Sequence, residues 1–442
     1  MKHTCILGSG ICGLTAAWKE EQKGNRVTII DSSAQVGGVI ESHRKEGFLL
    51  DYGPNTLSLR LRSTDDFLQK TGILKHAIDA NQQANKRFIV RDETLVALPQ
   101  GFTSFLTSKF LSPKGKLRLL LEPFLPRGTH DPDESVASFV SRRLGKEALQ
   151  YAANPFLAGV YAAKPETLCL RHAFPGLLRL EKEARSIFLG IVKGIGKSEK
   201  IPSSRLLSFP EGLKELPKRL STVLKGNILL EHSVTQVRKI ESGWKITASN
   251  SDGTIHEQSF DEIICTIPAH KLQTIQWLNI EKEEEIAKLS NAQHFPLSLV
   301  YLGFNRSDVS HALDGFGFLV PECEKKDILG TLFSSTLFPD RAPPDKVLLT
   351  TFVGGERNPD LALLDEDSLC RIVFNQLSPL LGICAEPVFQ HVKTWKQAIP
   401  LPDASLGDRK KASQKLHLAN PGLLFSGSHL TGPPLPSCLD AA

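Results

Sequence analysis

The sequence predicts a protein of the α/β class that begins with a parallel β-α-β unit. Three consecutive segments carry this prediction. Residues 4–7 form a short apolar run, residues 14–18 have a helical pattern, and residues 26–30 form a second apolar run rich in β-branched side chains. Glycines separate the first run from the helix. Strand, glycine-rich turn, helix and strand in this order form a parallel unit.

The rest of the chain is long enough for more than one core. With 442 residues, we expect several domains. From about residue 100 to 200 the pattern is helical and rich in Phe and Leu. Strand patterns return from 227 to 267, and alternating runs at 299–302 and 348–353 indicate a second, mostly antiparallel sheet. A final strand is predicted at 423–426.

Composition and charge exclude several classes of protein. Hydrophobic residues at 41% and charged residues at 23% are typical of a globular protein. The net charge of +5 is scattered, which fits an acidic small molecule or an anionic membrane surface better than nucleic acid. The eight cysteines form no CxxC pair, so we expect no metal site, no disulfide framework and a reducing cytoplasm. We expect no leader before the first strand, and only peripheral membrane contact, because no run of 18 apolar residues exists.

The turn after the first strand has the pattern G-x-G-x-x-G. It reads Gly8-Ser9-Gly10-Ile11-Cys12-Gly13. The first glycine permits the tight turn, the second lets the backbone approach a pyrophosphate, and the third lets the helix pack on the sheet. Asp31 ends the second strand eighteen residues after Gly13, where a carboxylate accepts hydrogen bonds from ribose hydroxyls. The sequence therefore predicts a dinucleotide site, which FAD and NAD both fit, rather than a glycine turn in an ordinary sheet.

Two further segments favour FAD. Residues 36–42 read VGGVIES, and residues 47–56 read GFLLDYGPNT. Here the chain resembles the flavin amine oxidase superfamily, although Gln35 replaces the usual Arg. The resemblance implies that FAD is also bound by Gly38, Val39, Gly53, Pro54, Asn55 and Thr56, and by the backbone of Val234 at the adenine. Val234 has an equally good interpretation as a strand core residue.

Over nearly its whole length the chain resembles oxygen-dependent protoporphyrinogen oxidases. The resemblance lies in residues 85–90 and 98–101, 156–162 with 171–175, 209–213, 315–321 and 395–400. It implies FAD-dependent oxidation of protoporphyrinogen IX to protoporphyrin IX in heme biosynthesis, with molecular oxygen as acceptor. The implied substrate contacts are Arg87, Gly159, Phe316 and Leu319. No catalytic side chain is implied, because the flavin takes the hydride.

The physical needs of such a substrate agree with these residues. A porphyrinogen is a large apolar macrocycle with propionate groups, so its site needs apolar walls and a cation at the rim. Phe316, Leu319 and Phe352 can supply the walls, and Arg87 can pair bidentately with a propionate. Core packing for each Phe, and a solvated surface position for Arg87, are the competing interpretations.

The C-terminal segment departs from the family. The resemblance implies FAD contacts at Gly427, Pro433, Pro434 and Leu435, in a turn that normally opens a helix beneath the flavin. The two prolines lack N–H donors, and the sequence stops four residues after Cys438. We therefore expect a short closing helix.

These observations together predict a glutathione-reductase-type, Rossmann-like FAD-binding domain with two insertions. The expected FAD-binding parts are 1–80, 201–270 and 401–442; the mixed-sheet substrate domain is 81–98 and 271–400; the helical domain is 99–200. The helical domain has a candidate membrane surface in Phe102, Phe105, Leu106 and Phe110, ringed by Lys109, Lys114, Lys116 and Arg118. A buried helical core fits this pattern equally well.

Three alternatives remain open. A coproporphyrinogen III oxidase of the same flavoprotein type would need further cations at the rim, and the sequence places none besides Arg87. A flavin amine oxidase would need a paired-aromatic cage, which the sequence does not show. A non-catalytic carrier on the same fold would tolerate the altered C-terminal turn. Oligomeric partners are also left open.

Overall fold

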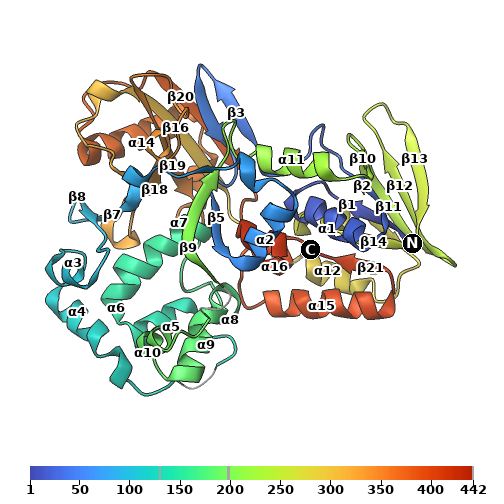
Figure 1. The fold of residues 1–442 in the computed structure, drawn as a ribbon, viewed down its shortest axis with the longest axis horizontal. Coiled ribbons are helices and arrows are strands. Elements are labelled where there is room, and N and C mark those ends of the chain that lie inside the picture. The colour runs from blue at the N-terminus through green and yellow to red at the C-terminus, as the bar shows by residue number, and fades with distance from the viewer. Residues whose placement is uncertain (129–130, 197–199, 441–442) are drawn as a thin grey trace.

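The computed structural model describes residues 1–128, 131–196 and 200–440. Figure 1 shows three regions. A parallel sheet with its helices lies at one end of the long axis, a large mixed sheet lies at the other, and a helical region lies below the mixed sheet. The parallel sheet includes both the first and the last strand of the chain.

The parallel sheet has five strands. In spatial order they are β10 (Asn227–Leu229), β2 (Arg26–Ile30), β1 (His3–Leu7), β14 (Glu262–Cys265) and β21 (Leu423–Phe425). Every neighbouring pair is parallel. The predicted β-α-β unit is confirmed, with helix α1 (Ile11–Gln22) joining β1 to β2. The strands are almost wholly apolar because both faces of the sheet are covered.

The mixed sheet has seven strands. Their order is β20 (Phe389–Trp395), β16 (Leu297–Asn305), β19 (Lys346–Gly354), β18 (Ile328–Phe333), β17 (Gly315–Leu319), β7 (Lys86–Arg91) and β8 (Thr94–Ala97). All pairs are antiparallel except β17 with β7. The predicted antiparallel pairing of the runs at 299–302 and 348–353 is therefore confirmed. Helix α14 (Glu366–Leu381) packs on one face through Leu369, Val373 and Leu377, which leaves the opposite face for the site.

Smaller sheets connect these two. A three-stranded sheet of β5 (Leu57–Leu61), β9 (Lys200–Ser208) and β6 (Ile78–Asp79) lies between the parallel sheet and the mixed sheet. A hairpin joins β3 (Ser42–Lys45) to β4 (Phe48–Asp51). The fourth sheet contains β13 (Ile255–Phe260), β12 (Gly243–Ser249), β11 (Ser233–Ile240) and β15 (Gln276–Leu278), at the far end of the molecule (Figure 1).

The helical region is built from short helices. They are α3 (Phe102–Thr107), α4 (Pro113–Leu120), α5 (Val136–Arg143), α6 (Lys146–Ala148), α7 (Asn154–Tyr161), α8 (Leu170–Ala173), α9 (Pro175–Ala184) and α10 (Ile187–Val192). A 3₁₀ turn, Glu122–Phe124, follows α4. Phe139, Leu157, Leu168 and Leu170 form part of its apolar core.

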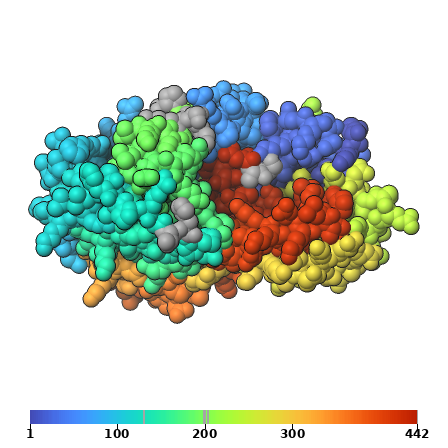
Figure 2. Space-filling view, turned by 90° about the horizontal axis from the view of Figure 1, so that it is seen from below, coloured from blue at the N-terminus to red at the C-terminus, as the bar shows by residue number. Residues whose placement is uncertain are grey.

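The remaining helices surround the parallel sheet and the mixed sheet. They are α2 (Arg62–Lys70), α11 (Glu215–Val223), α12 (Glu284–Ser290), α13 (Ser334–Leu337), α15 (Leu406–Ala419), α16 (Ser428–Thr431) and α17 (Leu435–Asp440). Figure 2 shows α15 beside the yellow residues near 285, and α12 and α15 are in contact. The short closing helix expected from the sequence is α17, which packs against α1.

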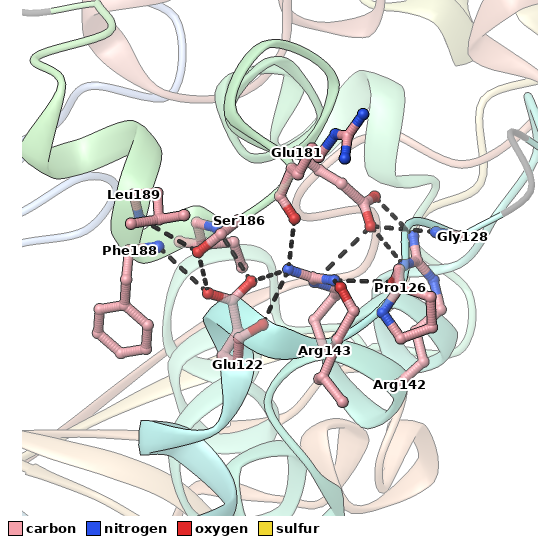
Figure 3. Close-up of polar contacts among 12 residues, drawn as sticks. Glu122, Pro126, Gly128, Arg142, Arg143, Glu181, Ser186, Phe188 and Leu189 are labelled. Atoms are coloured by element: carbon pink, nitrogen blue, oxygen red, sulfur yellow. Dashed lines mark hydrogen bonds and ion pairs between the residues drawn. The ribbon is translucent and has the colours of Figure 1, made fainter.

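A network of buried charges stabilises the helical region (Figure 3). Arg143 pairs with Glu122, and its guanidinium also lies 3.6 Å from Glu181. Glu122 accepts hydrogen bonds from the Ser186 hydroxyl at 2.5 Å and from the Ile187 backbone N–H at 3.0 Å. These bonds hold the start of α10 against the 3₁₀ turn. Burial alone would raise the pKa of Glu122, but the hydrogen bonds and Arg143 outweigh it, so the pKa lies below its usual value.

Among the described residues, no helix is both long enough and apolar enough to cross a membrane. The division into 1–80, 81–98, 99–200, 201–270, 271–400 and 401–442 stays a prediction. Each of the three segments assigned to cofactor binding contributes at least one strand to the five-stranded sheet.

Candidate cofactor and substrate site

The carboxyl ends of four parallel strands meet at one edge of the five-stranded sheet. Gly8 follows β1, Asp31 follows β2, Thr266 follows β14, and Gly427 lies two residues after β21. In an open parallel sheet this edge is where ligands bind. The site is therefore assembled from segments more than 400 residues apart in the sequence.

The first turn leaves room for a ligand at one glycine only. A Cβ at Gly13 would lie 1.9 Å from the Gly8 carbonyl oxygen, and a Cβ at Gly8 would lie 2.9 Å from the Thr266 hydroxyl. A Cβ at Gly10 would meet no protein atom within 4 Å. Gly8 and Gly13 are thus glycines because protein packs on them, whereas the space at Gly10 is open to a ligand at the start of α1. These positions fit a pyrophosphate.

Asp31 is held by the same turn. Its carboxylate accepts hydrogen bonds from the Ser9 backbone N–H at 2.5 Å, the Ser9 hydroxyl at 2.8 Å and the Ser33 N–H at 2.7 Å. The chain leaving β10 runs beside it, because the His232 N–H donates to the Asp31 carbonyl at 2.9 Å. Val234, two residues later, is the second residue of the β11 ladder and is partly buried. Ser9, Asp31 and Val234 therefore lie on one side of the turn, although a ribose or adenine contact stays a prediction.

The second glycine motif lies against the first. The Gly37 N–H donates to the Ser9 carbonyl at 3.0 Å, and a Cβ at Gly38 would lie 3.3 Å from the Gly10 Cα. A Cβ at Gly53 would lie 2.0 Å from the Val39 carbonyl oxygen. The side chain of Val39 is 54% exposed. The structure thus brings the three predicted cofactor segments, residues 8–13, 37–39 and 53–56, together.

The turn that carries Gly53 and Pro54 also touches the mixed sheet. The Tyr301 hydroxyl donates to the Asp51 carbonyl at 2.6 Å, and the Trp395 indole donates to the Tyr52 carbonyl at 2.7 Å. Asp51 itself is buried, and desolvation raises its pKa despite the nearby Arg341. The Asp51 carboxylate accepts from the Ser42 hydroxyl and the Leu213 N–H. Asp51 is therefore a structural anchor, and Asn55 and Thr56 lead from this turn into β5.

The C-terminal segment packs against α1. Leu435 is buried in the core that contains Ile11 and Cys12, whereas Pro433 is half-buried and Pro434 is exposed. The Cys438 thiol donates to the Gly432 carbonyl at 3.7 Å. The neighbouring Cys438 thiol and burial raise the pKa of Cys12 well above its usual value, whereas the interaction with Cys12 lowers the pKa of Cys438. The prolines precede α17, and the Pro434 carbonyl accepts from the Ser437 N–H at 2.9 Å. Gly427 has φ +137°, which favours glycine.

The predicted substrate residues gather on the face of the mixed sheet opposite α14. Leu319, Gly330 and Phe352 lie side by side on β17, β18 and β19. A Cβ at Gly159 of α7 would lie 2.7 Å from the Leu319 side chain. Phe318 points into the core beneath α14, whereas Phe316 packs with Leu332. These two residues of β17 differ in their surroundings because the register of β17 with β7 shifts between Gly315 and Phe318. Helix α7 and three strands thus enclose one apolar surface.

Arg87 lies at the margin of this surface. Its guanidinium is 5.2 Å from the ring centre of Phe316, a cation–π contact. Desolvation, with a smaller effect from the positive charge of Arg60, lowers the pKa of Arg87. Sequence reasoning did not single out Arg60 or Thr266. Arg60 stands on β5, and Thr266 supports the glycine turn by donating to the Leu7 carbonyl at 2.8 Å; neither belongs to a local motif.

A glycine turn with open space at a parallel-sheet edge, next to an apolar surface on a second sheet, is the arrangement of an FAD-dependent oxidoreductase. Residues 11–441 match the family model described as flavin-containing amine oxidoreductase. The chain belongs to this family.

Among curated relatives, the protein is similar to protoporphyrinogen oxidase 2 of Arabidopsis thaliana, with 32% identity over 98% of this chain and 90% of the relative. It is also similar to coproporphyrinogen III oxidase of Bacillus subtilis (strain 168), with 26% identity over 99% and 96%. A crystal structure from Exiguobacterium sp. 255-15, described provisionally as a protoporphyrinogen oxidase, has a TM-score of 0.79 at 22% identity and covers 99% of this chain and 96% of its own. That structure supports the fold alone.

Proposed function

We propose that this protein oxidises protoporphyrinogen IX to protoporphyrin IX in heme biosynthesis, with FAD as cofactor and molecular oxygen as acceptor. The observation that carries the proposal is the position of Arg87 over Phe316, beside the surface formed by Leu319 and Phe352. A macrocycle with propionates needs this combination of an apolar wall and a cation at its rim. The name of the Arabidopsis relative supports the same substrate.

The residues of this chain bind the cofactor and the substrate and orient them relative to each other. The glycines at 8, 10 and 13 and the start of α1 hold the pyrophosphate, Asp31 holds the ribose, and residues 38–39 and 53–56 cover the cofactor. Bound FAD would supply two-electron oxidation, needed three times because the macrocycle loses six hydrogens, with each electron pair passed to oxygen to give hydrogen peroxide. Phe316 and Leu319 fix the plane of the substrate, and Arg87 fixes its edge. No side chain of the chain is assigned a proton transfer.

The second candidate substrate is coproporphyrinogen III, which carries more carboxylates. The Bacillus subtilis relative favours it, and so does the presence of Arg60 near Arg87, a second cation that the sequence did not reveal. The test is anaerobic reduction of the bound flavin, followed at 450 nm, with the two porphyrinogens side by side. Bleaching by protoporphyrinogen at the higher rate supports the proposal. Faster bleaching by coproporphyrinogen supports the alternative, and no bleaching by either overturns both.

We further propose peripheral attachment to an anionic membrane, at the inner face of the cytoplasmic membrane. The support is an exposed apolar surface on α3, α4, the 3₁₀ turn and α10, which we call the apolar helical surface. Its most exposed members are Phe102 (67%), Phe124 (84%) and Val192 (79%). An exposed apolar surface of this kind is unusual on a protein that binds neither a membrane nor a partner.

The prediction of this surface from the sequence was wrong for one of its apolar residues. Phe110 is 9% exposed and packs with Ile89 and Leu111, so it belongs to the core instead. Lys116 and Arg118 donate to backbone carbonyls of their own region. Lys114 and Lys193, both exposed, are better placed to meet anionic headgroups.

A further inference from the structure

One tyrosine of the cofactor turn is bonded to the mixed sheet through both its backbone and its side chain. Tyr52 directly precedes Gly53, and only 6% of its surface is exposed. Its backbone N–H donates to the Glu41 carbonyl at 2.9 Å, and its carbonyl accepts from the Trp395 indole at 2.7 Å. Its hydroxyl is hydrogen-bonded to Nε2 of His391 at 2.7 Å. Every polar group of Tyr52 therefore has a partner, and two of the three partners stand on β20.

Strand β20 presents alternate residues to this tyrosine. His391, Lys393 and Trp395 share one face of the strand, because successive side chains of a strand point to opposite faces. The Lys393 ammonium lies 5.2 Å from the centre of the Tyr52 ring and 4.3 Å from that of Trp395. On β3, His43 stacks on the Tyr52 ring with 4.5 Å between the ring centres. Residues of two strands thus fix the orientation of the Tyr52 side chain.

The Tyr52 hydroxyl is the donor in its bond to His391. The Lys45 ammonium lies 3.2 Å from the same ring nitrogen and can only donate. A proton on Nε2 would face this ammonium, so we assign the proton of the neutral ring to Nδ1, which lies 3.6 Å from a carboxylate oxygen of Glu366. Phenylalanine in place of Tyr52 would therefore remove one hydrogen bond and leave the aromatic ring in its packing.

On the cofactor side, close packing connects Tyr52 to the glycine turn. A Cβ at the adjacent Gly53 would lie 2.0 Å from the Val39 carbonyl oxygen, and a Cβ at Gly38 would lie 3.3 Å from the Gly10 Cα. Contacts this close leave little room for the backbone to adjust. A displacement of Tyr52 would therefore be transmitted through these segments to the edge of the parallel sheet.

On the substrate side, Tyr52 shares an apolar cluster with one wall of the substrate surface. Leu299 and Tyr301 of β16 belong to this cluster, and Phe352 of β19 packs against it. Leu299 and Phe352 are also paired across the sheet. Tyr52 therefore lies in a continuous series of contacts that leads from the glycine turn to the apolar wall.

We propose that Tyr52 is a positioning residue, which together with His391 fixes the distance and angle between the cofactor and the macrocycle. This inference rests on the proposed function and deepens it. Hydride transfer requires the reacting atoms to lie about 3–3.5 Å apart, and a misplacement of about 1 Å can slow a reaction roughly a hundredfold. Tyr52 connects the cofactor edge to the substrate sheet and is assigned no contact with either molecule. Its hydroxyl therefore affects the rate of flavin reduction more than the binding of cofactor or substrate.

The first test compares FAD-loaded Tyr52→Phe with the wild-type protein. In anaerobic stopped flow, we expect the better porphyrinogen to reduce the flavin of Tyr52→Phe about tenfold more slowly, whereas KM and the FAD dissociation constant change less than about twofold. His391→Leu should reproduce the slower reduction, and His391→Gln should recover part of the rate because its amide oxygen can accept the bond.

Tyr151→Phe is the matched control. The Tyr151 hydroxyl donates to Glu324 at 3.3 Å, and Tyr151 stands in the helical region. This variant loses one tyrosine hydroxyl bond, as Tyr52→Phe does, and should keep the wild-type rate of flavin reduction. The double variant Tyr52→Phe/His391→Leu should be no slower than either single variant, because both remove the same bond.

The second test does not depend on turnover. Mesoporphyrin, a porphyrin that cannot be oxidised further, is bound to the FAD-loaded protein, and the circular dichroism of its Soret band reports its orientation relative to the neighbouring chromophores. We expect Tyr52→Phe to bind mesoporphyrin as tightly as the wild-type protein but with an altered Soret band. Tyr151→Phe should leave both the affinity and the band unchanged.

Two results would overturn the role of Tyr52 while the proposed function stands. One is a Tyr52→Phe protein with the wild-type rate of flavin reduction and an unchanged Soret band. The other is a Tyr52→Phe protein that loses its FAD, which would make Tyr52 a residue of cofactor retention instead. If no porphyrinogen reduces the flavin of the wild-type protein, the proposed function is wrong, and the role of Tyr52 with it.

Discussion

Arg143 and Glu122 form an ion pair from which water is almost completely excluded, with exposed fractions of 1% and 0%. Glu122 binds the start of α10, and Arg143 also donates to the Pro126 and Arg185 carbonyls at 3.0 and 2.9 Å. The pair therefore joins segments that carry the apolar helical surface. When one partner of such a buried pair is removed, the other is left as an uncompensated buried charge, which lowers the stability of the fold.

We predict that Glu122→Gln or Arg143→Met lowers the free energy of unfolding by about 3–5 kcal/mol, because each leaves the other group buried without its partner. The double variant Glu122→Gln/Arg143→Met should lose less than the sum of the single variants. Urea denaturation followed by circular dichroism measures all three. Additive losses would show that the pair contributes no coupling.

Gly10 and Gly13 should respond differently to a larger side chain. A Cβ at Gly10 meets no protein atom within 4 Å, so Gly10→Val should fold normally and purify without flavin. A Cβ at Gly13 would collide with the Gly8 carbonyl, so Gly13→Val should lose both flavin and thermal stability. The 450 nm absorbance and the melting temperature separate the two effects. A fully yellow Gly10→Val protein would contradict the position assigned to the pyrophosphate.

Arg87→Ala should raise the Michaelis constant for the porphyrinogen about tenfold, since a charge-assisted pair is typically worth ~1.5–3 kcal/mol. Arg87→Lys should recover only part of this loss, because an ammonium group cannot form the bidentate fork. Phe316→Ala should also slow flavin reduction, since the ring orients the substrate plane. Stopped-flow and steady-state kinetics distinguish these outcomes. Unchanged kinetics of Arg87→Ala on every porphyrinogen would show that Arg87 does not anchor a propionate of the substrate.

The apolar helical surface should bind anionic vesicles at low salt. Each apolar side chain that enters the headgroup layer contributes roughly 1.5–3 kcal/mol, so Phe124→Ser with Val192→Ser should remove most of the bound protein in co-sedimentation. Leu418→Ser is the matched control, because Leu418 is 71% exposed on α15, outside this surface. Equal sedimentation of all variants, or of none, would refute attachment through this surface.

Stability should fall in mild acid because of His429. Burial, reinforced by Arg409 and two nearby histidines, lowers its pKa to about 3, and Nε2 has no hydrogen-bond partner among the described residues. Between pH 6.5 and 3 the unfolded chain carries a proton on this residue that the folded protein lacks, so the free energy of unfolding decreases as pH falls.

The expected loss from His429 between pH 7.5 and pH 5 is about 2 kcal/mol. His429→Gln should lose correspondingly less over this interval, measured by urea denaturation at both pH values. His172, whose pKa lies at about 4 through burial and nearby cations, stays in both proteins and cancels in the comparison. An identical pH dependence of the two proteins would show that His429 is protonated in the folded state.

Local patterns predicted well how the chain is arranged at the carboxyl edge of the parallel sheet. The turn at residues 8–13, Asp31 and the doublet at 37–38 are each recognisable in a few residues, because close backbone approaches require glycine there. The contact between Gly159 and Leu319 was not predictable as a contact, since α7 and β17 meet only through tertiary packing. Arg60 escaped notice for the same reason. Its charge contributes to the lowered pKa of Arg87 on another sheet, and no motif surrounds it.

The order of strands in the parallel sheet has a consequence for how the protein is made. Strands β1 and β2 emerge from the ribosome early, but their neighbours β10, β14 and β21 come from residues 227–229, 262–265 and 423–425. Helix α17, which packs on α1, comes later still. A nascent chain therefore presents the glycine turn long before the edge around it is complete. Flavin capture should be a late, post-translational step, and cells starved of riboflavin should accumulate full-length apoprotein rather than stalled fragments.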